Sequence, residues 1–235
     1  MEHITSTDID QTVDTVVTIG NFDGVHMGHR KLIETAKEYA EKLSLKLVVL
    51  TFNPHPMFVF GDRKNAALIM SPEEKCITME KMGVDTYIEY PFDKEFASMS
   101  PEDFAIKLLF ERLRSKVVVV GYDYHFGSKQ KGDDKLLEKL GKEYGVKTVF
   151  IPKVIYEGSR VSSTRIRECI LNRDIDCADR LLTEPYFIVG RVEKGKRIGR
   201  TIGFPTANIL AHPDKLFPPN GVYATATVFK NKVYY

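Results

Sequence analysis

The stretch VVTIGNFDGVHMGHR, residues 16–30, decides how the chain folds. It begins as an apolar, β-branched run and breaks into a glycine-rich turn. From Lys31 onward, apolar residues recur at helical spacing, at Leu32, Ile33, Ala36, Tyr39, Ala40 and Leu43. The pattern predicts a strand that passes through a tight turn into a helix.

The turn itself is suited to an anion. Gly20, Gly24 and Gly28 allow tight turns and let a ligand approach the backbone. A helix that begins near Gly28 directs unpaired N–H groups and its positive dipole end toward the turn. His26 and His29 are three residues apart, so both imidazoles can face one site and stabilise a transferring phosphoryl group. Two ordinary histidines at a helix start are the alternative, but their coincidence with three glycines favours a phosphate site.

Outward from this turn, strand and helix patterns alternate. Further strands are predicted at residues 46–52, 86–90, 116–120 and 146–151. Ser-Pro followed by acidic residues at 71–74 and 100–103 predicts two helix starts. The alternation predicts an α/β fold, a Rossmann-like, doubly wound parallel sheet. No G-x-G-x-x-G follows the first strand, so the usual dinucleotide signature is missing.

Composition excludes several classes of function. The chain has 235 residues, 43% of them hydrophobic, which suits one large domain or two modest ones. Its 34 basic and 32 acidic residues leave a net charge of +2, which gives no case for nucleic acid or an anionic membrane as partner.

Targeting and cysteine signals are equally plain. No apolar run reaches the length of a membrane-spanning helix, and the polar start from Met1 to Asp14 is unlike a signal peptide, so we expect a cytoplasmic protein. Cys76, Cys169 and Cys177 form no C-x-x-C pair, so neither a disulfide framework nor a zinc site is expected.

Two loops follow predicted strands at the edge where open α/β sheets bind ligands. The first, Asn53-Pro54-His55-Pro56, makes His55 a candidate ligand contact, and a solvent-exposed turn histidine is an equally good interpretation. The second, residues 121–127, carries Asp123 among three aromatic residues. Asp123 suits a ligand contact or a turn cap, and the aromatic side chains suit a flat ring or the core.

Residues 160–167 place hydroxyl groups and arginines at a predicted helix start. Ser163, Thr164 and Arg167 could supply donors and a bidentate cation to phosphate, although a capped helix with exposed arginines explains the same pattern. Thr183-Glu184-Pro185 predicts a domain boundary, giving an α/β domain over residues 1–184 and a β-rich module over 185–235.

The second module carries two motifs for phosphate or metal chemistry. Residues 190–196 match G-x-x-x-x-G-K, but Arg197 stands where a P-loop needs Ser or Thr and no helix pattern follows. We therefore reject a P-loop. Thr206 and Asn208 lie on one side of an extended segment, and their oxygens could hold a hard cation such as magnesium.

Taken in order, these motifs resemble one known family. The motifs are G-N-F-D-G-V-H-x-G-H from Gly20, the His55-Pro56 loop, the Asp123 loop, S-T-x-x-R from Ser163 and P-T-A-N from Pro205. From about Val16 to its end, the chain resembles the prokaryotic bifunctional riboflavin kinase/FMN adenylyltransferases, the FAD synthetases. The resemblance implies transfer of AMP from ATP to FMN, giving FAD and pyrophosphate.

The resemblance also implies roles for individual residues. His26 and His29 would bind the ATP phosphates and stabilise the transition state, with Arg167 as the third catalytic residue. The implied ATP contacts are Gly20, Asn21, Phe22, Gly24, Gly28, Ser163 and Thr164. The implied FMN contacts are Asn53, His55, Pro56 and Asp123. In the riboflavin kinase module, Thr206 and Asn208 would hold Mg²⁺.

Departures from the family pattern set two expectations. Tyr124 and His125 stand where the family often has Phe and Arg, and Asn53 stands where it often has Glu. The family's kinase domain is a six-stranded β-barrel longer than residues 186–235, and its catalytic glutamate is expected beyond Tyr235. We therefore predict FMN adenylylation but little or no riboflavin phosphorylation.

The same motifs are compatible with two other functions. Another H-x-G-H nucleotidyltransferase would act on a different phosphorylated acceptor, and the P-T-A-N motif from Pro205 and the Asp123 loop argue against it. A non-catalytic flavin- or nucleotide-binding regulator is the other, and intact His26, His29 and Arg167 argue for activity instead.

Overall fold

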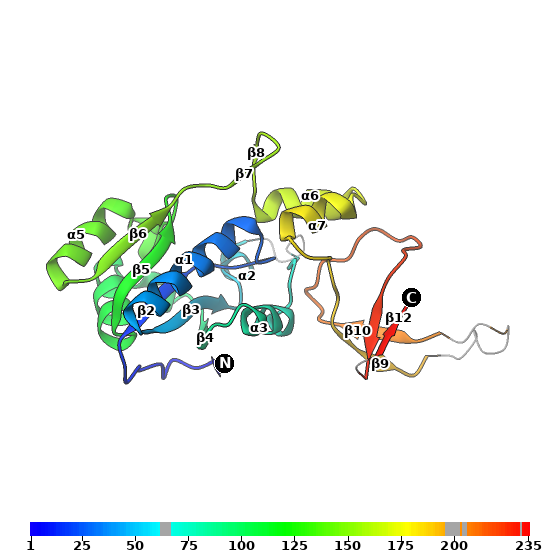
Figure 1. Ribbon diagram of the computed structural model, residues 1–235, viewed down its shortest axis with the longest axis horizontal. Coiled ribbons are helices and arrows are strands. Elements are labelled where there is room, and N and C mark those ends of the chain that lie inside the picture. Colours follow the sequence, from blue (N-terminus) through cyan, green and yellow to red (C-terminus); the bar gives the residue numbers. More distant parts are fainter. Residues whose placement is uncertain (62–66, 196–202, 204–205, 231) are drawn as a thin grey trace.

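A parallel six-stranded sheet forms the centre of the molecule, in the order β1-β4-β3-β2-β5-β6 (Figure 1). The computed structural model describes residues 1–61, 67–195, 203, 206–230 and 232–235. The strands are β1 Glu2–Ile4, β2 Thr15–Ile19, β3 Lys46–Asn53, β4 Thr86–Pro91, β5 Ser115–Gly121 and β6 Lys147–Ile151. Because every pairing in this sheet is parallel, the predicted Rossmann-like α/β fold is confirmed.

Helices link the strands and begin where the sequence places their caps. They are α1 Met27–Leu43, α2 Pro56–Phe60, α3 Pro72–Lys81, α4 Pro101–Asp103, α5 Asp134–Tyr144, α6 Ser163–Leu171 and α7 Ile175–Leu182. Helix α4 runs directly into a π-helix, η3 Phe104–Arg112, and the described residues also form two short 3₁₀ turns, η2 Phe96–Ser98 and η4 Ser128–Gln130. At α3, Ser71 and Glu74 form the reciprocal capping box that the Ser-Pro-acid pattern indicates.

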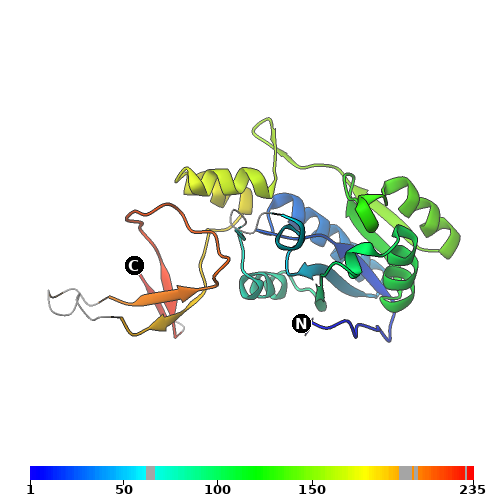
Figure 2. The ribbon, with the colours of Figure 1, turned by 180° about the vertical axis from the view of Figure 1, so that it is seen from behind.

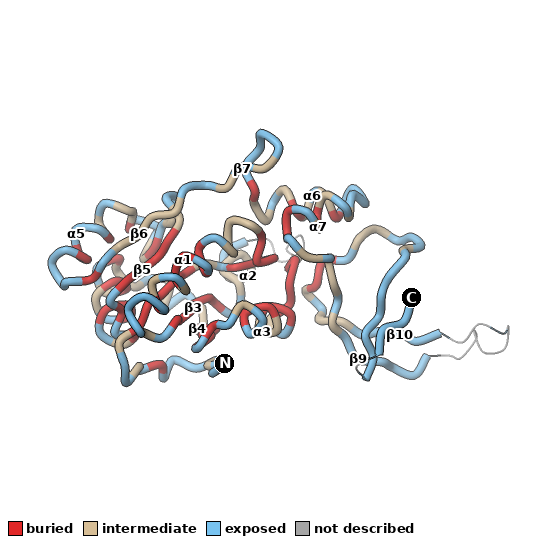
Figure 3. The backbone as a smooth tube through the Cα atoms, viewed as in Figure 1, coloured by how far each residue is buried: buried red, intermediate tan, exposed pale blue. Residues whose placement is uncertain are grey.

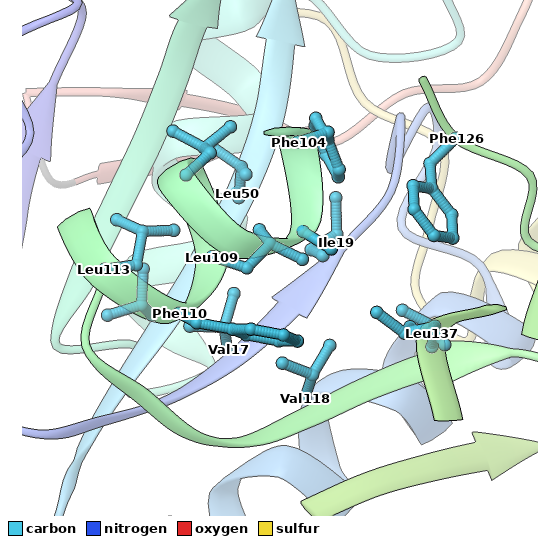
Figure 4. Packing of buried hydrophobic residues seen from close by; sticks show 14 of the residues in the cluster. Val17, Ile19, Leu50, Phe104, Leu109, Phe110, Leu113, Val118, Phe126 and Leu137 are labelled. Carbon is cyan, nitrogen blue, oxygen red and sulfur yellow. The ribbon is translucent and has the colours of Figure 1, made fainter. Parts of the chain in front are cut away.

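Alternate residues of the central strands pack on opposite faces of the sheet. Val17 and Ile19 of β2 and Val118 of β5 face η3 and α5 in one cluster (Figure 4). Their neighbours Val16 and Val117 belong to a second cluster with side chains of α1 and α3. Since both faces are covered, these strands are apolar throughout, and each buried side chain contributes about 1.5–3 kcal/mol to folding.

The chain reverses its direction of winding at β2. Strands β3 and β4 extend the sheet on one side of β2, and β5 and β6 extend it on the other. The crevice outside the carboxyl ends of β2 and β5 is therefore the topological switch point, where open α/β sheets bind ligands. Residues 20–26 leave β2 into this crevice and lead to α1.

The second module lies beyond α3 and α7, away from the sheet (Figure 2). Its described strands form two antiparallel pairs, β9 Gly190–Glu193 with β10 Asn208–Ala211 and β11 Thr227–Phe229 with β12 Lys232–Tyr234. Most of these residues are exposed (Figure 3). Between these pairs, residues 222–226 have no regular structure.

Helices α6 and α7 pack against a third core cluster. It includes Ile69 and Val161 from the first domain and Leu216 from the second module. A short hairpin of β7 Ile155–Tyr156 and β8 Ser159–Arg160 precedes α6. No helix within the described ranges is both long and apolar enough to span a membrane.

Candidate active site

The two histidines of the glycine-rich turn stack on each other at the start of α1. Their ring centroids lie 3.7 Å apart with an interplanar angle of 12°. His26 is the N-cap residue of α1, and its Nδ1 accepts a hydrogen bond from the backbone N–H of His29 at 3.3 Å. The helix start therefore fixes both imidazoles at one place, as their spacing predicts.

Burial keeps both imidazoles neutral. Desolvation lowers the pKa of His26 to about 4, and it also lowers the pKa of His29 well below its ordinary value. Because Nδ1 of His26 accepts a bond, the proton of the neutral ring is on Nε2, which is left as a donor. A bound polyphosphate would favour the protonated forms and gain donors from both rings.

A cavity of about 270 Å³ lies against these histidines, and we call it the histidine cavity. It is lined by residues from the carboxyl ends of β2, β5 and β6, from the start of α1 and from the start of α6. Lys153 and Arg160 add positive charge to the lining. This combination of cations, helix start and hydroxyl groups suits a polyphosphate.

A larger cavity of about 780 Å³ adjoins it, and we call it the aromatic cavity. Its aromatic lining comes from several separate segments of the chain and comprises Phe52, Phe60, Phe92, Phe96, Phe104, Tyr124 and Phe126. Gly20, Asp123 and Tyr124 line both cavities, so the two meet at the ends of β2 and β5. A flat, largely apolar ring system fits such a lining.

Asp23 ties the glycine-rich turn to two distant segments. Its side chain is 2% exposed, accepts a bond from the backbone N–H of Met70 at 3.1 Å and forms an ion pair with Arg167. Its carbonyl oxygen accepts a bond from Ser163 Oγ at 2.9 Å. The turn and the start of α6 are thus joined through one buried carboxylate residue.

The predicted ATP contacts fall into three groups. Gly20, Gly28 and Ser163 line the histidine cavity, whereas Asn21 lines the aromatic cavity. Thr164 is exposed and lies outside the linings of both cavities.

Phe22 and Gly24 have packing surroundings. Phe22 is fully buried with its ring edge-on to His29. Gly24 has φ of +87° and packs against Ile69 and Leu182. Both residues shape the turn from behind, and neither lines the two cavities.

The predicted catalytic Arg167 is held behind the turn. Its Nε donates to the carbonyl of Ala67 at 3.0 Å, and its guanidinium pairs with Asp23. In this conformation Arg167 does not line the histidine cavity. It is connected to that cavity through Asp23, which bonds both Arg167 and the cavity residue Ser163.

The predicted FMN contacts divide in the same way. Pro56 lines the aromatic cavity and Asp123 lines both cavities. Asn53 donates to Glu89 Oε2 at 2.9 Å, and His55 caps α2 by accepting from Met57 N–H at 3.1 Å. Neither of these two side chains lines the aromatic cavity, and desolvation lowers the pKa of His55 to about 4.

Thr206 and Asn208 lie in the second module and are both exposed. Asn208 stands opposite Glu193 in the β9–β10 pair, so their side chains share one face. The amide oxygen of Asn208 and the carboxylate of Glu193 are ligands that Mg²⁺ accepts, and Thr206 lies two residues before Asn208, the first residue of β10. The preceding Phe204 and Pro205 lie outside the described residues.

Sequence reasoning missed several residues of the site. Arg160 and Lys153 approach Asp123 at 2.5 Å and 3.5 Å, and Asp23 joins the turn to α6. Lys75 of α3 is 3% exposed. Desolvation lowers its pKa, although the nearby charges of Glu89 and Asp23 act to raise it. Asp23 could have been found as the one acid of the G-N-F-D-G motif, whereas the others carry no local signal.

Comparison with known proteins identifies two family segments. Residues 8–165 match the FAD synthetase family model, and residues 182–235 match the riboflavin kinase model. The chain is 40% identical over 209 residues to the bifunctional riboflavin kinase/FMN adenylyltransferase of Escherichia coli K12, covering 89% of this chain and 66% of that one. It therefore spans slightly less than two thirds of that relative.

Two further proteins show the same likeness. The Bacillus subtilis protein of the same name is 37% identical over 227 residues, covering 96% of this chain and 71% of that one. A solved structure described as a macrolide-efflux protein from Streptococcus pneumoniae superposes with a TM-score of 0.87 at 33% identity. That superposition covers 100% of this chain and 77% of the other.

Proposed function

Because the chain belongs to the FAD synthetase family, we propose that it transfers AMP from ATP to FMN, giving FAD and pyrophosphate. An oxygen of the FMN phosphate would attack the α-phosphorus of ATP. The bond from that phosphorus to the β-phosphate oxygen breaks, and pyrophosphate leaves. Such a transfer needs in-line positioning and charge stabilisation more than covalent help from the protein.

The observation that carries the proposal is the junction of the two cavities. ATP phosphates suit the histidine cavity, and the isoalloxazine ring of FMN suits the aromatic cavity. Since Gly20, Asp123 and Tyr124 line both, an acceptor phosphate and a donor phosphate can meet there. An added Cβ at Gly20 would lie 3.3 Å from the ring of Phe22, so the glycine lets the turn pack closely on that ring.

The residues at the junction have complementary tasks. His26 donates from Nε2 toward phosphate, and His29 stacks behind it within the first turn of α1. Lys153 and Arg160 add positive charge beside the acceptor. Arg167 acts through Asp23 in this conformation, and we propose that it turns to the leaving pyrophosphate when ATP is bound.

Magnesium is proposed at two places. With ATP, Mg²⁺ would neutralise part of the phosphate charge during the transfer. In the riboflavin kinase segment, Thr206 and Asn208 would hold it, with Glu193 across the β9–β10 pair. Partners beyond ATP, FMN and riboflavin are not proposed, and the cytoplasmic location stays a prediction.

The decisive experiment measures FAD formed from FMN and ATP by the 235-residue chain and by His29→Ala. Loss of one preorganised donor is expected to lower kcat by on the order of 10²-fold. His3→Ala is the matched control, since His3 lies in β1 and outside both cavity linings. Unchanged FAD formation by His29→Ala would refute the proposed role of the histidines in AMP transfer.

The acceptor is tested by ligand-induced stabilisation. FMN is expected to raise the melting temperature, because a ligand that binds only the folded state stabilises it by mass action. Phosphopantetheine, nicotinamide mononucleotide and glycerol phosphate are the comparison ligands. Stabilisation by one of these and not by FMN would favour another H-x-G-H nucleotidyltransferase.

A further inference from the structure

A lysine from the second module is buried against the first domain. The side chains of Lys215 and Glu74 are both 0% exposed, and Nζ lies 2.7 Å from Oε2. The ammonium also donates to the carbonyl oxygens of Ile69 at 2.7 Å and Phe187 at 2.8 Å. Its three hydrogens therefore all have acceptors, and the ring of Tyr186 lies 4.3 Å away.

Residues 212–216, which we call the strap, add backbone pairing to this contact. The N–H of Leu68 donates to the carbonyl of Asp214, and the N–H of Leu216 donates to the carbonyl of Leu68, both at 2.7 Å. Leu216 is 7% exposed and packs in the cluster of α6 and α7. The strap thus holds Leu68 and Ile69 through their backbone.

The two residues held by the strap are flanked by bonds to the site. On one side, the carbonyl of Ala67 accepts from Arg167 Nε at 3.0 Å. On the other side, the N–H of Met70 donates to Asp23 Oδ1 at 3.1 Å. The ion pair of Asp23 and Arg167 is therefore bracketed by a segment that the second module fixes in place.

The path continues from Asp23 into the histidine cavity. Ser163, which lines that cavity, donates from Oγ to the carbonyl of Asp23. Residues 67–71 line neither cavity, and their hydrogen bonds lead through Asp23 to Ser163 of the histidine cavity. A shift of the strap would consequently act on the phosphate side of the site through this path.

We propose that Lys215 is a positioning residue for the ATP side of adenylyl transfer, so that the riboflavin kinase segment completes the adenylyltransferase site. This inference rests on the proposed function. Lys215 acts by holding Ile69, and through Ile69 the pair of Asp23 and Arg167. It touches no substrate.

The bond pattern favours positioning over simple stabilisation. Buried ion pairs are weak sources of stability, because desolvation of both charges offsets their attraction, and apolar replacements are often as stable. Lys215 instead donates two of its three hydrogen bonds to backbone carbonyl oxygens, those of Ile69 in the first domain and Phe187 after α7. Such bonds fix backbone position, which a purely apolar contact does not.

Three variants of the 235-residue chain test the proposal. Lys215→Met removes the ammonium, and Lys215→Met with Glu74→Gln removes both charges. The single amide oxygen can accept from only one of the two N–H groups that Glu74 serves, those of Ser71 and Val189. The control is Arg173→Met, because Arg173 donates to Asn220 of the second module at 3.0 Å without reaching residues 67–71. Circular dichroism identifies a temperature at which each variant is folded. If Lys215→Met alone is unfolded at every temperature, the double variant is used to test the proposal.

Two readouts separate positioning from loss of folded protein. Steady-state FAD formation gives KM for ATP and for FMN, and calorimetry gives ATP affinity without any turnover. We expect both strap variants to raise KM and Kd for ATP on the order of tenfold or more, with KM for FMN unchanged. Unfolding of a fraction of the sample would lower the apparent kcat and leave both KM values alone.

Each result has one meaning. ATP affinity equal to that of the parent chain in both strap variants would overturn the inference, and so would recovery of ATP affinity in the double variant. If the parent binds ATP but forms no FAD, the proposed function fails, and calorimetry still decides the role of Lys215. A parent chain that binds no ATP would refute both.

Discussion

Gly24→Ala is the substitution whose cost the structure defines best. Gly24 has φ of +87°, and an added Cβ would lie 3.1 Å from Ile69 Cγ2 and 3.2 Å from Leu182 Cδ2. A non-glycine residue in the left-handed region costs about 1–2 kcal/mol. Crowding of a packed core adds about 1–3 kcal/mol. The expected loss in free energy of unfolding is their sum, about 2–5 kcal/mol.

Gly158→Ala separates the two contributions. Gly158 has φ of +73°, and an added Cβ there would meet nothing within 4 Å. Its expected loss is therefore the backbone part alone, about 1–2 kcal/mol. Urea unfolding followed by circular dichroism measures both variants, and the m-value checks that they unfold alike. Equal losses in the two variants would refute the argument that Gly24 is required for packing against α7.

The remaining predictions concern pH, the cavity junction and the second module. Burial lowers the pKa of His26 from 6.5 to about 4, so the unfolded chain binds more protons between these values and stability falls as the pH is lowered through that window. His26 contributes at most about 3 kcal/mol to this loss. Urea unfolding at pH 7 and pH 5 should show it, and an equally steep loss in His26→Gln would contradict the assignment. Asp123→Asn leaves an exposed cluster with Arg160 and Lys153, so the free energy of unfolding should change by less than about 1 kcal/mol. Its kcat/KM for FAD formation should fall on the order of tenfold, because Asp123 lines both cavities; a large stability loss with an unchanged rate would oppose this. Riboflavin should be phosphorylated much more slowly than FMN is adenylylated, since the described strands of the second module form two separate pairs, and robust ATP-dependent conversion of riboflavin to FMN would contradict it.

The sequence predicts most of the first domain because its strands are buried on both faces. A continuous apolar run such as residues 117–120 has few alternatives to a central parallel strand. The structure extends the predicted strand 116–120 by one residue at each end. Strand β1 was not predicted, since Glu2–Ile4 is a short edge strand with two exposed residues. The π-helix η3 has the same apolar stripe as an α-helix, so periodicity does not distinguish the two.

Long-range contacts explain what the sequence hides in the site. The Ser71–Glu74 capping box is readable from four adjacent residues and is confirmed. Yet the same Glu74 accepts from Val189 and pairs with Lys215, which are 115 and 141 residues away. Likewise, Arg167 was predicted to face phosphate, and only the fold shows that Asp23 occupies its guanidinium.

The contact of Lys215 with Glu74 also has a consequence for the order of protein synthesis. The ribosome releases α3 long before it makes Lys215, and at about 5–20 residues per second that interval lasts several seconds or more. During this time the Glu74 carboxylate has no lysine partner, and Leu68 and Ile69 lack the strap. Residues 67–71 of the nascent first domain therefore lack the bonds from the strap until residues 212–216 have been made.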